Sequence, residues 1–335
     1  MRSRSFPRRH LAAGLATIAM IGALVSCSGV QNGAGDEGPA EAEDYPSRAI
    51  ELVVGSSAGG STDLLARALA TAVEPAIGER VGVVNLPGAN GALAAEDVLT
   101  RTPDGQTLML APASLFTITP LFVTEDEAMS LDDLQIITGV GREDYVLVTN
   151  KSSGFASIED LVAAGRNINY ATAGVGTGGQ LSQALLFNAL EIEATDVPFD
   201  GGALAVTALL GNQVDVASVS LLEASQYLDS GDFVPLAVFG EERSEFLPDV
   251  PTAVEQGYDV VVTQSRFVVA PLDVPDAIVE KIVAAFDAAF ADPEYQAFLE
   301  SSFIAPDQTD AEETAANLQA AKERYEAAAK EAGLI

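Results

Sequence analysis

From residue 45 onward, short apolar runs alternate with longer segments in which apolar residues recur every three or four positions. Short apolar runs bounded by Gly, Pro or Asn predict buried strands. Longer segments with apolar residues three and four positions apart predict amphipathic helices. The predicted strands are 50–54, 81–84, 107–110, 145–149, 168–172, 214–219 and 234–239, and the predicted helices are 62–73, 92–100, 180–190, 203–210, 277–290 and 311–332. Strands that alternate with helices indicate an α/β fold with largely parallel sheets.

The N-terminus has another pattern. The first ten residues contain four Arg, and residues 11–25 are uncharged and mostly apolar. A membrane-spanning helix needs roughly 20 residues, so this shorter run is typical of a signal peptide. Leu24-Val25-Ser26-Cys27 resembles a bacterial lipobox, which predicts a lipoprotein signal peptide at 1–26 and lipidation of Cys27. A signal that is not lipidated is the alternative, and Sec and twin-Arg export both stay open.

Residues 28–44 are rich in Gly, Ala and acids and offer little to bury. With Cys27 they predict a flexible acidic tether over 27–44. The rest of the chain, 45–335, is long enough for about two domains.

The amino-acid composition excludes several classes of catalytic and metal-binding site. The chain has 17 basic and 49 acidic residues, a formal charge of −32, one His and one Cys. Removal of the four N-terminal arginines with the signal peptide would make the charge −36 and would also remove His10. A mature chain without His excludes a Ser-His-Asp triad and a His-ligated metal, and one Cys excludes an internal disulfide. The negative charge argues against nucleic acid as a partner. We therefore expect no cofactor and no metal.

Three Gly-rich segments follow predicted strands. Gly55-Ser56-Ser57-Ala58-Gly59 matches G-x-S-x-G, the motif that would make Ser57 a nucleophile. No His remains as its base, and a Ser-Lys variant would need one of only four Lys residues. The non-catalytic interpretation is better, because a Gly-rich turn before a helix presents N–H groups that suit an anion.

The second segment, 174–179, matches the dinucleotide fingerprint G-x-G-x-x-G. An exported protein would meet little NAD, and the same geometry serves a carboxylate. The third segment, 85–91, predicts only a tight connection from a strand to a helix.

Together these segments resemble the Bug receptors, the substrate-binding components of tripartite tricarboxylate transporters. The resemblance extends in order over nearly all of 45–335, through segments 45–50, 54–67, 85–91, 103–108, 170–181, 197–202, 211–215 and 243–252.

The resemblance implies a two-lobed periplasmic-binding-protein fold (type II-like), with a sheet flanked by helices in each lobe and a ligand cleft between the lobes. Lobe one is expected to take 45–144 and 263–335 and lobe two 145–262, with a hinge where the chain crosses. By position, the resemblance places carboxylate-binding groups at Ser56, Ser57, Ala58, Gly59, Gly60 and Thr62, and at Ala173, Gly174, Val175, Gly176 and Thr177. Ser114, Asp200 and Ser220 are candidates for the rim of the cleft.

The chain also departs from the family pattern. Gly55-Ser56 replaces Pro-Phe, Gln180 replaces a frequent His, Asp200 replaces a Lys or Arg, and Ser265 replaces a frequent Trp. These departures argue against a compact dianion and leave open a monocarboxylate, or a ligand with an amine that pairs with Asp200. Arg266 is a candidate counter-charge for the ligand, but a surface salt bridge is the favoured interpretation.

The expected function is that of a non-catalytic, extracytoplasmic, lipid-anchored receptor. It would capture a small carboxylate and deliver it to membrane permease subunits, and would contact the bilayer only through its lipid. An exported Ser hydrolase that uses Ser57 and a sensory binding protein with the same fold are the alternatives.

Overall fold

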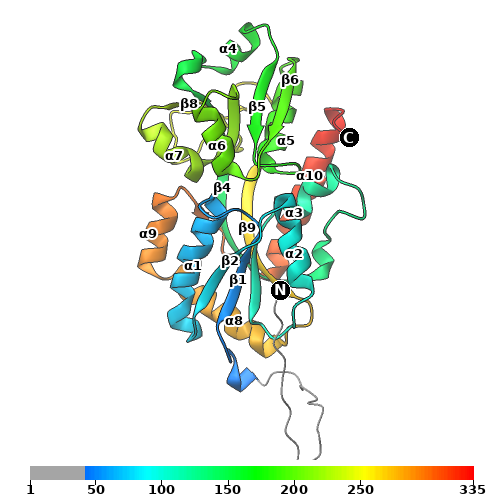
Figure 1. Cartoon of the computed structure of the whole chain (residues 1–335), viewed down its shortest axis with the longest axis vertical. Coiled ribbons are helices and arrows are strands. Elements are labelled where there is room, and N and C mark those ends of the chain that lie inside the picture. The colour runs from blue at the N-terminus through cyan, green and yellow to red at the C-terminus, as the bar shows by residue number, and fades with distance from the viewer. Residues whose placement is uncertain (1–41) are drawn as a thin grey trace, which may run out of the picture. The chain divides into compact units, whose positions relative to one another are not determined.

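Two β-sheets that share one long strand organise residues 42–335, the part of the chain that this computed structural model describes (Figure 1). The predicted signal peptide, Cys27 and most of the predicted tether lie outside these described residues.

The first sheet forms lobe one. Its strands run in the order β2-β1-β3-β9-β4, and β10 also pairs with β4. Their bounds are β1 Ile50–Val54, β2 Val81–Asn85, β3 Thr107–Pro112, β4 Leu134–Asn150, β9 Thr263–Pro271 and β10 Ala305–Pro306. The helices around it are α1 Ser61–Ile77, α2 Ala92–Leu99, α3 Ser114–Thr117, α8 Asp276–Phe290 and α9 Pro293–Ser301. Strand β1 is parallel to both β2 and β3.

The second sheet forms lobe two, in which β4 lies between β8 and β7, and β7 leads on to β5 and β6. The strands are β5 Ile168–Thr172, β6 Ala194–Pro198, β7 Val216–Ser220 and β8 Phe233–Val238. The helices are α4 Ile158–Ala163, α5 Gly178–Ala189, α6 Gly202–Leu210 and α7 Leu221–Asp229. Strand β5 is parallel to β6 and β7. Because parallel strands direct their carboxyl ends to one edge, the β1–α1 and β5–α5 loops both lie where α/β sheets bind ligands.

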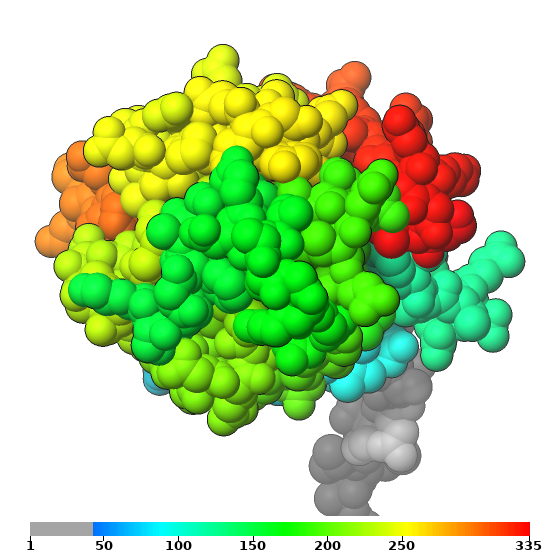
Figure 2. All heavy atoms as spheres, turned by 90° about the horizontal axis from the view of Figure 1, so that it is seen from above, coloured from blue at the N-terminus to red at the C-terminus, as the bar shows by residue number. Residues whose placement is uncertain are grey.

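Strand β4 connects the lobes. It pairs with β9 as far as Asp144 and with β7 from Tyr145 onward. Helix α10 (Ala311–Glu331) also extends along both lobes, since Leu318 packs in a lobe-one cluster and Tyr325 in a lobe-two cluster. Figure 2 shows this red C-terminal segment beside the green segments of lobe two. The lobe-one assignment of 263–335 therefore omits contacts that α10 makes with lobe two.

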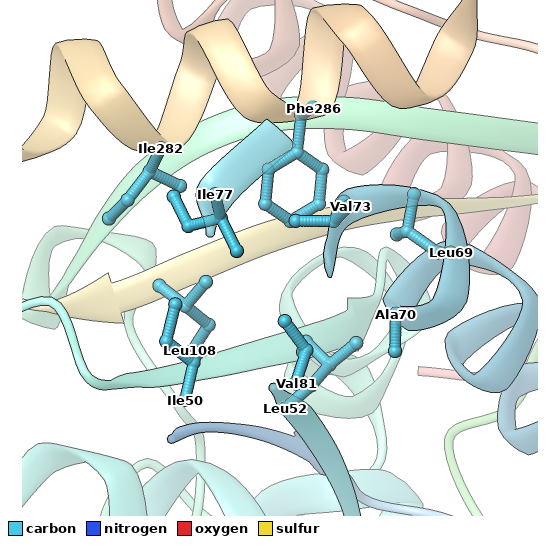
Figure 3. Close-up of a pocket in the computed structure, with 10 residues that line it drawn as sticks. All are labelled: Ile50, Leu52, Leu69, Ala70, Val73, Ile77, Val81, Leu108, Ile282 and Phe286. Atoms are coloured by element: carbon cyan, nitrogen blue, oxygen red, sulfur yellow. The ribbon is translucent and has the colours of Figure 1, made fainter. Parts of the chain in front are cut away.

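The core of lobe one lies between β1, β3, α1 and α8. Figure 3 shows apolar side chains from β1, β3, α1 and α8, together with Val81 of β2, around a pocket. The cavity has a volume of about 10 Å³. This volume admits one water at most, and its walls offer no hydrogen-bond partner. We therefore assign the cavity to core packing rather than to a ligand.

This packing predicts unequal costs for one substitution at two sites. Leu52 is 1% exposed in the core, and Leu272 is 45% exposed. Leu52→Ala should lower the free energy of unfolding by about 2–5 kcal/mol, because it removes buried methyl groups and leaves a cavity. Leu272→Ala should change it by less than about 0.5 kcal/mol. Urea denaturation measures both, and equal losses would contradict the assigned core.

Candidate functional site

A cleft of about 800 Å³ lies between the lobes and is lined by both. The β1–α1 loop and the segment 87–90 line it from lobe one. The β5–α5 loop, the segment 198–204 and the end of β7 line it from lobe two.

The β1–α1 loop lines this cleft and contains backbone N–H groups without an internal partner in the described part of the chain. The N–H groups of Ser57 and Ala58 donate to no acceptor among the described residues. Gly59 N–H, in contrast, donates to the carboxylate of Asp63 (2.8 Å). Burial opposes ionisation of Asp63, but hydrogen bonds from Arg67, Gly59 and Asn85 outweigh it and hold the pKa of Asp63 below its ordinary value. Asp63 therefore holds the loop at Gly59, while the N–H groups of Ser57 and Ala58 keep no internal acceptor in residues 42–335.

The β5–α5 loop repeats this arrangement in lobe two. The N–H groups of Gly174 and Val175 have no acceptor within residues 42–335. Gly176 N–H donates to the side-chain oxygen of Gln180 (2.7 Å). The Thr177 hydroxyl donates to Gly174 C=O (2.8 Å) and caps α5 by accepting from Gln180 N–H (3.3 Å). The sequence predicts binding groups throughout both loops, and in each loop several backbone N–H groups, among them these, have no acceptor within residues 42–335.

Most of the predicted site residues line the cleft. They are Ser56, Ser57, Ala58, Gly60, Thr62, Ala173, Gly174, Val175, Thr177, Asp200 and Ser220. Gly59, Gly176, Ser114 and Arg266 do not line it. The structure gives these four residues contacts inside the protein, and their assignment to ligand binding, which rests on the family resemblance, stays a prediction.

Arg266 needs the largest correction. The expected surface salt bridge is wrong, because Arg266 is 1% exposed and pairs with Glu143, whose side chain is also fully buried. Its guanidinium further donates to the hydroxyls of Thr62 (2.9 Å) and Ser61 (2.5 Å) at the start of α1. The arginine thus lies behind the cleft wall, with its charge balanced by an internal carboxylate.

Asn90 is a contact residue that the sequence did not single out. Its side-chain amide donates to Gly176 C=O of lobe two (3.1 Å) and to the hydroxyls of Ser114 (2.9 Å) and Thr119 (3.0 Å). The Thr119 hydroxyl also donates to Gly176 C=O (3.2 Å). A tight turn was the sequence interpretation of 85–91, but Asn90, which has a positive φ of 53°, also contacts the other lobe through its side chain. Asparagine tolerates this left-handed conformation better than most residues, which was the available signal.

Glu223 was also missed. It caps its own helix α7 together with Ser220, and its carboxyl group also accepts from Ser61 N–H of lobe one (3.5 Å). Burial, with a further contribution from the Glu143 carboxylate, raises the pKa of Glu223. Among the described residues that line the cleft, the Asp, Glu, Lys, Arg and His residues are Asp200 and Glu223, so both are acids.

Metal binding and membrane insertion find no support in residues 42–335. No cluster of three or more His, Cys, Asp or Glu side chains there has the arrangement to hold a metal ion. None of the helices in this part of the chain combines the length and apolarity needed to cross a membrane.

Comparison with known proteins identifies the family. Residues 65–334 match the family model described as "Tripartite tricarboxylate transporter family receptor". The chain belongs to this family. The resemblance to Bug-type receptors that the motifs indicated is thereby confirmed, and it makes the protein one of a family of extracytoplasmic solute-binding receptors.

Individual relatives agree with this assignment. The "UPF0065 protein in gbd 5'region" of Cupriavidus necator is 31% identical over 262 residues, which cover 77% of this chain and 79% of that protein. The periplasmic binding protein BugD is similar in structure, with a TM-score of 0.80, 28% identity and coverage of 86% of this chain and 99% of BugD. R. palustris Rpa4515, solved with adipate, has a TM-score of 0.82, 26% identity and coverage of 87% and 99%. The predicted two-lobed periplasmic-binding-protein fold is confirmed.

The Arg266–Glu143 pair predicts strong coupling in stability. Arg266→Met alone should cost about 3–5 kcal/mol of unfolding free energy, because it leaves a buried carboxylate without a partner. Adding Glu143→Gln should restore a large part of that loss. A double-mutant cycle by urea denaturation measures the coupling, and additive losses in the two single variants would contradict it.

The cross-lobe contact at Gly176 predicts a difference between two glycines. Both Gly176 and Gly59 have positive φ, so alanine should strain the backbone at each by about 1 kcal/mol. Only at Gly176 would the new Cβ meet the opposite lobe, at 2.7 Å from Thr119 Cα, whereas nothing lies within 4 Å at Gly59. Gly176→Ala should therefore separate the lobes and increase the radius of gyration in solution X-ray scattering. An unchanged radius, equal to that of Gly59→Ala, would contradict the contact.

Proposed function

We propose that this receptor is exported, anchored to the cell membrane by lipid on Cys27, and captures a small carboxylate for delivery to membrane permease subunits of a tripartite tricarboxylate transporter. The observation that carries the proposal is the pair of loops with unpaired amides on opposite walls of the cleft. The relative Rpa4515, which was solved with adipate, supports the ligand class.

A carboxylate suits the two loops. Ser57 and Ala58 N–H groups from lobe one and Gly174 and Val175 N–H groups from lobe two offer donors without a formal charge. Hydrogen bonds from N–H groups to an ionised acceptor are stronger than those between neutral groups. A ligand that accepts from both walls at once would hold the lobes together and exclude water, which strengthens those bonds further.

The hydroxyls of Ser61 and Thr62 add to the lobe-one donors. Both line the cleft, and both oxygens accept hydrogen bonds from Arg266. A hydroxyl that accepts from a cation becomes a better donor itself, because hydrogen bonds in a chain polarise one another. In this way Arg266 contributes to anion binding through two hydroxyls, although it does not line the cleft.

Apolar side chains supply the rest of the walls. Phe199, Val123 and Leu204 line the cleft together with Pro87 and Pro198. These groups suit the carbon skeleton of an organic acid, as in other small-molecule sites that combine apolar walls with a few placed polar groups.

The hydrolase alternative has weaker support. The Ser57 hydroxyl is within hydrogen-bonding reach of the Asp200 backbone carbonyl (3.4 Å), which is not a base. The four Lys residues lie in η5 (Lys151–Ser153), α8 and α10, outside the cleft lining.

Calorimetry on the purified, ligand-stripped protein tests the proposal with a panel of mono- and dicarboxylates. We expect binding of at least one carboxylate and no hydrolysis of ester substrates by either the wild type or Ser57→Ala. Binding of no carboxylate would contradict the ligand class. Ester turnover that is lost in Ser57→Ala would favour the hydrolase instead.

A further inference from the structure

We propose that binding of a carboxylate in the cleft is coupled to the uptake of a proton from water by the side chain of Glu223. The inference rests on the proposed carboxylate function and adds regulation by pH to the same site. The position of Glu223 carries it, because this acid lies between the two lobes, beside the loop that offers donors to the ligand.

Glu223 belongs to lobe two but reaches lobe one. It occupies the third position of α7 and lines the cleft. One carboxyl oxygen accepts from Ser61 N–H at the start of α1 (3.5 Å), and the other accepts from Ser220 N–H of its own helix (3.4 Å). Strong hydrogen bonds from N–H groups to an ionised acceptor are about 2.7–2.9 Å long. These two longer contacts therefore compensate a negative charge on Glu223 only weakly.

Backbone encloses the carboxyl group on other sides. At Gly202, the start of α6, an added Cβ would lie 2.2 Å from one carboxyl oxygen. At Gly60 of lobe one, an added Cβ would lie 3.8 Å from the other oxygen. Glu223 is nevertheless partly exposed where it lines the cleft, so a proton can reach it from there. A ligand in the cleft would replace the water on that side.

The strands beside Glu223 provide no cation for it. Arg266 of β9 is already paired with Glu143 of β4. Tyr145 of β4 also faces this region, and burial raises the pKa of its hydroxyl, which therefore stays neutral. Alternation along β4 places its other ionisable side chains on the opposite face of the strand, and these are Arg142 and Asp144.

The remaining neighbours add no free cation either. Strands β7 and β8 and helix α6 pack against α7 and contain no ionisable side chain. In α1, Asp63 is paired with Arg67, and Asp200 is a second, exposed acid of the cleft lining. Glu223 itself makes no ion pair within residues 42–335. Burial and the charge of Glu143 accordingly raise the pKa of Glu223 even before a ligand binds.

A bound carboxylate would add a further negative charge. It would lie at the β1–α1 loop, next to the helix start that one oxygen of Glu223 faces. When two carboxylates share a site, the pKa of one of them rises strongly. The ligand therefore raises the pKa of Glu223 further, and a proton passes from water to its carboxyl oxygen.

The sign of the pH dependence follows from this shift. The pKa of Glu223 is higher in the complex than in the free protein, so the complex holds more protons. Binding therefore tightens as the pH falls through the interval between the two pKa values, and it is independent of pH outside that interval.

Calorimetry in two buffers that differ in ionisation enthalpy counts the protons taken up with each ligand. The probe is the tightest ligand of the carboxylate panel, which includes adipate, malate, succinate and hexanoate. Titrations at about pH 6, 7 and 8 keep these acids largely ionised. We expect the wild type to take up as much as one proton for each ligand bound, and its Kd to rise by up to about tenfold per pH unit.

Glu223→Gln separates proton uptake from a structural role. Glutamine keeps an oxygen for the N–H groups of Ser61 and Ser220 and resembles the protonated acid. We expect this variant to lose the uptake and to bind at every pH with an affinity close to that of the wild type at the lowest pH. Asp200→Asn removes the other acid of the cleft lining and is the matched control, which should keep the wild-type uptake.

The outcomes are distinguishable. Absence of uptake in the wild type, or equal uptake by Glu223→Gln, overturns the inference while the carboxylate function stands. Weaker binding of Glu223→Gln at every pH with an unchanged pH slope assigns Glu223 to structure alone and also overturns it. Loss of uptake in Asp200→Asn with retention in Glu223→Gln has the same consequence. If no carboxylate of the panel binds, the proposed function is overturned and the inference with it.

Discussion

The buried ion pair between Arg266 and Glu143 is the interaction on which the arrangement of the cleft depends. Glu143 lies on β4 and Arg266 on β9, just before β4 changes its partner from one sheet to the other. Burying these two charged side chains costs desolvation free energy, which is offset only when the guanidinium and the carboxylate lie in contact. The pair therefore fixes how the two long strands lie against each other. The same guanidinium holds the hydroxyls at the start of α1. One residue therefore links the crossing between the lobes to the loop that offers amides to the ligand.

This pairing determines how the protein can hold an anion. A cation exposed in the cleft would bind carboxylates strongly but with little regard to geometry. With Arg266 neutralised behind the wall, attraction has to come from oriented N–H and O–H groups of the β1–α1 and β5–α5 loops. Such dipoles act only over short distances, so the geometry of these groups matters more than the overall charge of the protein. A strongly negative protein can bind an organic acid in this way without a positive field.

The sequence predicted what depends on local pattern. Both Gly-rich loops follow buried strands and precede helices as expected, because glycine punctuation and apolar periodicity are local signals. The pattern located only the second half of β4, over 145–149, because its first half pairs with β9 through contacts distant in sequence. The pattern did not predict helix α7, which directly follows strand β7, and so it also missed Glu223. Arg266 was misjudged because a charged residue is expected to be exposed unless its partner is known, and Glu143 lies far away in the chain.

The contacts between the lobes show why local patterns were insufficient at Asn90 as well. The sequence around Asn90 predicts an ordinary turn, which agrees with its left-handed backbone. It does not predict that Gly176 of the other lobe lies within hydrogen-bonding distance of the Asn90 side chain. Gly176 has no side chain there because the backbone of Thr119 approaches too closely. Gly176, which the motif suggested as a ligand group, also permits the close approach of the two lobes. Gly174 and Val175, which precede Gly176 in the loop, line the cleft, so the same loop supplies both a contact between the lobes and part of the cleft wall.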